Sequence, residues 1–162
     1  MNTSELVRTL ETLFSELVNG PPERGAFMLN SGDAGLLRSL DRLSAEAASA
    51  APAGGPSIAA NVEHLRYGLS LMNRWAAGEE NPFADADWSA AWRRRAVSDA
   101  EWARLRAELR GEAERWLVAL RTPREVRTVE LNGMVGSIAH LAYHLGAIRQ
   151  IDRATRGPSA DD

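Results

Sequence analysis

The sequence contains no cysteine among its 162 residues. Disulfides, thiolate nucleophiles, iron–sulfur clusters and cysteine-ligated zinc sites are therefore excluded. Lysine is also absent, because all 19 basic residues are arginine. Schiff-base chemistry and the P-loop are excluded as well, since both depend on a lysine amine. Any bound metal must be held by histidine, carboxylate or carbonyl groups.

The sequence also lacks an excess of basic charge and a long apolar run. The net charge is −3 and the isoelectric point is near 5.7, which argues against a nucleic-acid partner. No apolar run approaches the roughly 20 residues of a membrane span, and the N-terminus carries Glu5 where a secretory signal would be basic. The content of 44% hydrophobic and 25% charged residues is ordinary for a folded chain. We expect one cytoplasmic domain over residues 1–162, with no membrane partner.

Apolar residues recur every three or four positions in several stretches, which predicts amphipathic helices. The first stretch covers residues 3–19 and ends at the Gly-Pro-Pro triplet 20–22. The second covers about 33–49, behind a cap at Ser31 or Asp33. The third begins after the cap Ser57 and reaches about Ala77. Residues 78–97 are irregular, with a short helix expected at 87–95.

Two more helices are predicted in the second half of the chain. Ser98 and Glu101 form a capping box, and the helix behind it extends to about Leu120. Residues 122–132 mix strand-like residues with a proline and an Asn-Gly pair, so we expect a loop there. The last helix covers Gly133 to about Thr155.

Amphipathic helices without a strand ladder can bury their apolar faces only against one another. We therefore expect an all-α fold: an antiparallel four-helix bundle with an additional short N-terminal or connecting helix. The pattern leaves open whether segment 3–19 or segment 33–49 is the first bundle helix. The apolar stripes of these two segments could support a homodimer.

The three histidines of the chain all fall on core-facing arcs of predicted helices. His140 and His144 are four residues apart, so they leave one helix face one turn from each other, the spacing at which one helix can supply two ligands to a metal ion. His64 lies on the apolar side of the third helix. A lone histidine there is typically a packed, hydrogen-bonded residue. Three buried neutral imidazoles, however, cannot satisfy the ring nitrogens of one another as readily as a cation that accepts a lone pair from each. We therefore predict that all three bind a metal.

Two stretches carry a family resemblance: residues 57–65, SIAANVEHL, and residues 137–146, SIAHLAYHLG. They resemble the DinB/YfiT-like superfamily of metal-binding four-helix bundles, over about residues 33–155. The resemblance implies one histidine from the second bundle helix and an H-x-x-x-H pair from the fourth, which match His64, His140 and His144. It also implies a small-molecule substrate and transfer chemistry with a low-molecular-weight thiol such as bacillithiol or mycothiol, or a hydrolase activity.

Three imidazoles without a fourth protein ligand make an open metal site, which favours chemistry over a purely structural role. We expect a divalent ion, zinc or nickel first, with iron, manganese or copper as alternatives. Asn61 and Ser137 could orient the imidazole N–H groups. Glu112 is the inward carboxylate that could act as general acid or base.

The run Trp88 to Arg95 could grip an anionic thiol or phosphate, although such arginines typically pair with nearby acids such as Asp85, Asp87 and Asp99. Two other function classes stay open at this point. One is a metal- or small-ligand-binding helical module without turnover. The other is a structural or oligomerising helical domain whose histidines merely pack.

Overall fold

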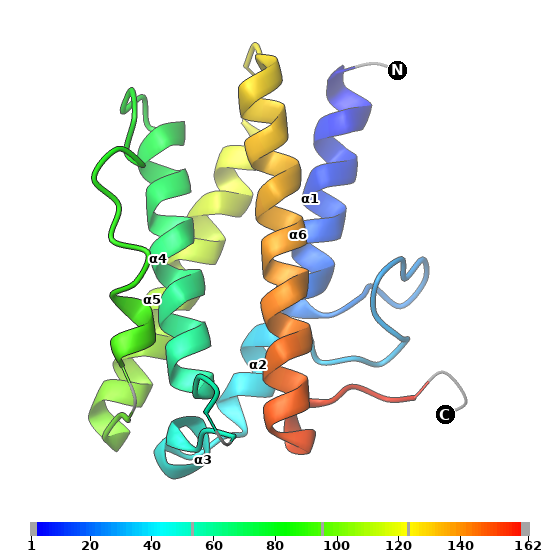
Figure 1. Ribbon diagram of the computed structural model, residues 1–162. Coiled ribbons are helices and arrows are strands. Elements are labelled where there is room, and N and C mark those ends of the chain that lie inside the picture. The colour runs from blue at the N-terminus through cyan, green and yellow to red at the C-terminus, as the bar shows by residue number, and fades with distance from the viewer. Residues whose placement is uncertain (1–2, 53, 95, 123, 160–162) are drawn as a thin grey trace.

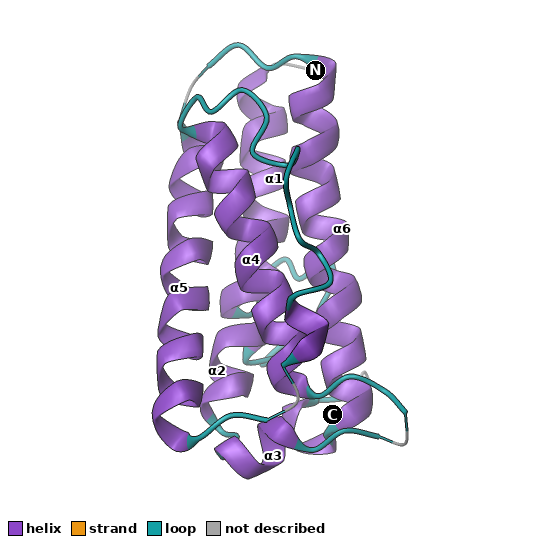
Figure 2. Ribbon diagram, turned by 60° about the vertical axis from the view of Figure 1, so that its left-hand side comes forward, coloured by secondary structure: helices purple, strands orange, loops and turns teal. Residues whose placement is uncertain are grey.

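The computed structural model describes residues 3–52, 54–94, 96–122 and 124–159. Four long helices, α1 (Thr3–Asn19), α4 (Ile58–Ala76), α5 (Asp99–Arg121) and α6 (Thr128–Ile151), form a bundle (Figure 1). Two short helices, α2 (Gly35–Asp41) and α3 (Ala45–Ser49), connect α1 to α4, and single 3-10 turns lie at η1 (Ala91–Arg93) and η2 (Arg153–Thr155). The described residues contain no strand (Figure 2). The predicted all-α bundle is confirmed.

The long helices are arranged so that α1 and α4 each contact both α5 and α6. Helices α4 and α5 run in one direction and α1 and α6 in the other (Figure 1). The parallel pair α4 and α5 requires a crossover, which residues 77–94 and 96–98 provide by returning along α4 (Figures 1 and 2). Helix α1 is therefore the first bundle helix, and the segment predicted at 33–49 supplies the connecting helices.

The core lies between the four apolar faces. Its largest fully buried side chains include Phe14, Leu17, Leu36, Ile58, Leu65, Leu109, Trp116, Leu141 and Ile148. Serine caps begin two of the long helices where the sequence predicts them. Ser57 accepts the Ala60 N–H at 3.2 Å, and Ser98 and Glu101 form the reciprocal capping box. No helix among the described residues has the length and apolar character needed to cross a membrane.

The second predicted helix is wrong as one continuous element, because it is divided into α2 and α3. Ser44 leaves the helical conformation, and its hydroxyl accepts the Ala47 N–H at 3.1 Å to begin α3. A serine that caps the following residues competes with continuation of the preceding helix. The expected cap Asp33 is not the N-cap of α2, a place taken by Ala34, but its carboxylate accepts the Gly35 N–H at 2.8 Å.

The start of the last helix also differs from the prediction. Helix α6 begins at Thr128, where Glu130 accepts the Arg127 N–H at 2.8 Å, so only the first part of the expected loop is irregular. Gly133, read as a break, lies inside α6. A Cβ at Gly133 would come within 2.5 Å of the Trp75 ring. The glycine is therefore explained by the close approach of two helices rather than by a turn.

The crossover holds less helix than expected. Within the predicted helix 87–95 only the 3-10 turn Ala91–Arg93 forms, and Arg95 lies outside the described residues. The last predicted helix ends at Ile151, and η2 follows after Asp152, whose side chain accepts the Ala154 N–H at 2.8 Å.

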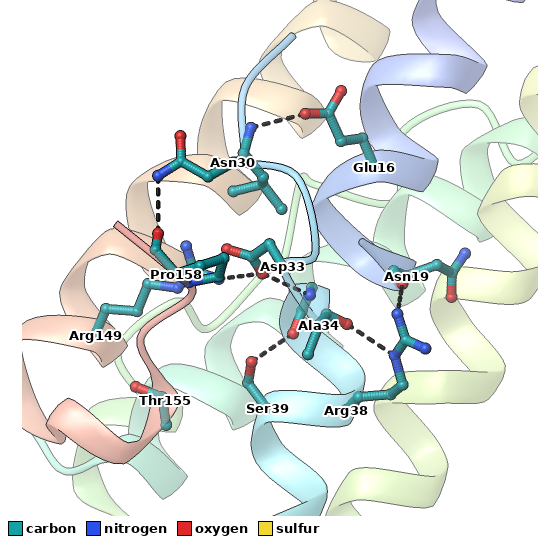
Figure 3. A network of polar contacts seen from close by, with 12 residues as sticks. Glu16, Asn19, Asn30, Asp33, Ala34, Arg38, Ser39, Arg149, Thr155 and Pro158 are labelled. Carbon is teal, nitrogen blue, oxygen red and sulfur yellow. Dashed lines mark hydrogen bonds and ion pairs between the residues drawn. The ribbon is translucent and has the colours of Figure 1, made fainter. Parts of the chain in front are cut away.

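Two buried carboxylates hold the segment between α1 and α2 against the bundle (Figure 3). Glu16 accepts the backbone N–H groups of Met28 and Leu29, each at 2.7 Å. Asp33 accepts two contacts from Arg149 of α6, at 2.7 and 2.9 Å. The contacts of Glu16 hold this segment to α1, and the Asp33–Arg149 pair joins it to the last helix.

Candidate metal centre

The structure brings the three histidines together between α4 and α6. The Nε2 atoms of His64 and His140 are 2.9 Å apart, and those of His140 and His144 are 3.1 Å apart. One ring nitrogen from each residue lies within 4.8 Å of the others. His64 and His144 are buried, with 8% and 4% of their surface exposed, and His140 is half-buried. Such a group of neutral nitrogen donors could hold a metal ion.

Asn61 determines which nitrogen of His144 carries the proton. The amide nitrogen of Asn61 donates to the Ser57 carbonyl at 2.9 Å, one helical turn back on α4. Its oxygen is therefore free to accept, and the His144 Nδ1–H donates to it at 2.8 Å. The Nε2 atom of His144 then presents a lone pair toward the other two rings. Asn61 thus orients an imidazole as the sequence predicts.

The three Nε2 atoms cannot satisfy one another fully as neutral groups. Because the Nε2 atom of His144 presents a lone pair, the hydrogen for these short nitrogen–nitrogen contacts must be carried by the Nε2 atom of His140 or of His64. A hydrogen on His140 lies between two acceptors, while a hydrogen on His64 leaves two lone pairs facing each other at 3.1 Å. In addition, His64 Nδ1 is buried without a hydrogen-bond partner among the described residues. A cation accepting three lone pairs would remove this conflict, so the donor set fits a metal.

Burial keeps these imidazoles neutral. Loss of solvent, together with the smaller effect of His140 nearby, lowers the pKa of His64 from 6.5 to about 4. The pKa of His144 is lowered from 6.5 to about 3, first by burial and then by His140 and His64. Burial lowers the pKa of His140 in the same direction. Near neutral pH all three rings therefore keep the lone pairs that a metal requires.

Metal-free protein is expected to lose stability as the pH falls from about 6.5 toward 5. In this window the unfolded chain protonates His64 and His144 whereas the folded chain does not, since the pKa values of these two residues are lowered to about 4 and 3. Protons then favour the unfolded state, by up to about 1.4 kcal/mol per histidine for each pH unit. Urea denaturation in EDTA at several pH values measures this slope. A His144→Gln variant should show a smaller slope, and an equal slope would contradict the argument.

Two tryptophans of the crossover cover His64, a position that the sequence did not predict although it singled out the run from Trp88 to Arg95. Trp92 stacks on His64 with ring centroids 4.5 Å apart and planes inclined by 27°, and Trp88 lies 5.7 Å from the same ring. Both tryptophans remain partly exposed, Trp88 at 39% and Trp92 at 38%. The available signal was a pair of tryptophans four residues apart in a segment without helical periodicity. Only the path of the crossover along α4 places them here.

The two described arginines of the same run are engaged in ion pairs. Arg93 binds Asp87 at 2.7 Å, one of the local acids expected for it, and Arg94 lies 4.0 Å from Glu63. Arg95, the third arginine of the run, lies outside the described residues. The ion pair of Arg93 agrees with the expectation that these arginines pair with nearby acids in water.

Glu112 lies on α5 and is engaged elsewhere. Its carboxylate accepts the side-chain amide of Asn73 at 2.6 Å and pairs with Arg115 at 2.7 Å. It does not belong to the described residues that line the cavity beside the histidines. A catalytic role for Glu112 stays a prediction that no contact with the histidines supports.

A cavity of about 410 Å³ opens beside the histidines, between α4, α6 and the crossover. His64 and His140 line it together with Ser137 and a set of apolar side chains. Ser137 does not contact an imidazole nitrogen. Its hydroxyl accepts the Trp116 indole N–H at 3.0 Å and donates to the Met134 carbonyl at 2.7 Å. The site thus combines a nitrogen donor set with a space for a small molecule.

Comparison with known proteins gives one family. The model of the DinB superfamily matches residues 29–148, which is well over half of the chain. The match includes all three histidines and starts after α1, the first bundle helix. No curated protein and no solved structure matches this chain.

Proposed function

The chain belongs to the DinB superfamily, and on that premise we propose that it is a mononuclear metal-dependent enzyme with His64, His140 and His144 as ligands. The observation that carries the proposal is the convergence of three Nε2 atoms with separations of 2.9 and 3.1 Å between successive pairs. Imidazole suits zinc and nickel, which we propose first, and iron, manganese and copper are alternatives. Three protein ligands leave coordination positions for water or substrate.

The reaction class that we propose is thiol transfer or hydrolysis on a small molecule. A bound divalent ion would supply Lewis acidity, a more acidic water or a stabilised thiolate. Asn61 holds the ring of His144 in position through its 2.8 Å contact, and Trp92 shields one face of His64 from water. The cavity lined by His64 and His140 provides room for the substrate.

A second candidate is a metal- or small-ligand-binding module without turnover. The observation that favours it is the lack of a charged side chain among the described residues that line the cavity. Its serine hydroxyl is already engaged by Trp116 and Met134. Proton transfer would then depend on water or on the substrate itself.

Metal analysis and a transfer assay test the two candidates together. The chain has three histidines and no cysteine, so untagged protein has no other imidazole or thiol to bind metal. Protein produced with added zinc or nickel is expected to carry one ion per chain, and His140→Ala to carry none. Bacillithiol, mycothiol and cysteine are then mixed with 1-chloro-2,4-dinitrobenzene, where the sulfur–carbon bond forms and chloride leaves.

Metal-dependent thioether formation, lost in His140→Ala, would support the thiol transferase. Metal without turnover on this panel or on a panel of carboxylic esters and amides would favour the binding module. Protein that takes up no metal at all would contradict both candidates and leave histidines that only pack.

A further inference from the structure

The cavity beside the histidines is apolar along its whole wall apart from the histidine end and Ser137. Six of its lining side chains are hydrophobic: Leu65, Leu69, Met72, Phe83, Trp88 and Leu141. No aspartate, glutamate or arginine belongs to the described residues that line it. A volume of about 410 Å³ lies in the range of pockets that bind small molecules.

Glycines on both helical walls keep this space open. A Cβ at Gly68 of α4 would lie 3.6 Å from both the His140 ring and the Trp88 ring, and one at Gly136 of α6 would meet nothing within 4 Å. Gly136 precedes His140 by one helical turn, so both residues occupy the cavity side of α6. A glycine inside a helix costs about 1 kcal/mol relative to alanine. Side chains at these two positions would reduce the volume next to the histidines.

Away from the histidine end, the polar groups of the wall offer nothing to a charged ligand body. The Ser137 hydroxyl is engaged by Trp116 and Met134, and the Nε2 atoms of His64 and His140 face each other. A carboxylate or phosphate placed against the apolar wall would lose its hydration without gaining a partner. Aromatic and aliphatic groups would instead gain from contact with the indole and leucine side chains.

We infer that this cavity binds the uncharged, apolar body of the substrate, an aryl or branched alkyl group, and places its single polar reacting end at the histidines. The inference rests on the proposed function, because the histidines are taken as the reacting end. On this inference the cavity holds the electrophile or the ester, and a charged thiol binds elsewhere.

Two pairs of probes test the inference. In Co²⁺-loaded protein, visible absorption reports binding of imidazole and of 4-phenylimidazole to the metal. The phenyl group is expected to tighten binding about tenfold or more, whereas 4-(imidazol-4-yl)benzoate, which adds a carboxylate at the far end of that ring, should lose most of the gain. In metal-free protein, 2-naphthol is expected to shift the NMR amide signals of Gly68 and Gly136, and 2-naphthoate is not.

Gly136→Leu places a side chain in the open space of the cavity and should abolish the preference for 4-phenylimidazole over imidazole. Gly146→Leu is its matched control, because this α6 glycine also has nothing within 4 Å of an added Cβ and does not line the cavity. Gly68→Ala, whose methyl group fits at 3.6 Å, is the milder second variant and should weaken 4-phenylimidazole binding in the same direction.

The outcomes separate the two proposals. Absence of a cobalt spectrum would overturn the proposed metal centre, while the naphthol pair would still decide what the cavity binds. Equal binding of charged and uncharged probes, or a preference that survives Gly136→Leu, would overturn the inference even if one metal ion is bound.

Discussion

Zinc is expected to raise the free energy of unfolding of EDTA-treated protein by about 4 kcal/mol when free zinc exceeds the dissociation constant a thousandfold. The physical reason is that His64, His140 and His144 meet only in the folded chain, where their ligand atoms lie within 4.8 Å. His140→Ala removes the nitrogen that contacts both others, at 2.9 and 3.1 Å, so zinc should no longer stabilise that variant. Urea denaturation with zinc and with EDTA measures both increments.

Two further variants make this test specific. Asn61→Ala removes the acceptor of the His144 Nδ1–H and should weaken zinc binding about 10- to 100-fold, which lowers the zinc increment by about 1 to 3 kcal/mol. Ser137→Ala instead leaves the buried Trp116 indole without its acceptor. It should lower stability in zinc and in EDTA alike and leave the increment unchanged. Equal zinc increments in the parent and in His140→Ala would refute the site.

Asp33→Ala is expected to destabilise the protein by about 3 kcal/mol. Asp33 is 3% exposed and accepts Arg149 at 2.7 and 2.9 Å and the Gly35 N–H at 2.8 Å. Its removal leaves a mostly buried guanidinium without its partner and frees the start of α2 (Figure 3). Gly157 packs so closely on this carboxylate that a Cβ there would overlap it. The midpoint of urea denaturation measures the loss.

Asp41→Ala is the matched control for this buried ion pair. Asp41 also pairs with two arginines, Arg106 and Arg110, each at 2.9 Å, but its side chain is 44% exposed. Water screens exposed pairs, so the expected loss is below about 1 kcal/mol. Similar losses in Asp33→Ala and Asp41→Ala would mean that burial does not decide the strength of these contacts.

The helices and the inward direction of the histidines follow from local chemistry. Apolar periodicity and the serine caps predict α1, α4 and α5 nearly to the residue, because both signals arise within one or two helical turns. The i, i+4 spacing of His140 and His144 becomes a common direction as soon as α6 forms. The same spacing does not predict which ring nitrogens of the histidines come into contact.

Local signals misled where a distant contact or a capping side chain decided the outcome. Gly133 reads as a helix break in the sequence, yet it lies inside α6 because Trp75 of α4 needs the space that a Cβ would fill. Ser44 sits within an apolar pattern that continues on both sides, and its hydroxyl contact with Ala47 divides the helix. Neither effect is visible in hydrophobic periodicity.

The sequence by itself determined the helical class, the absence of cysteine thiols and lysine amines, and the face on which each histidine lies, since composition and helical geometry require no knowledge of neighbours. Tertiary structure alone decided that α4 and α6 are adjacent, that Trp88 and Trp92 cover His64, and that Asp33 meets Arg149 across 116 positions of chain. These contacts depend on how the helices pack and on the path of the crossover. Many arrangements satisfy the same apolar pattern, and only the packing of specific side chains selects one of them.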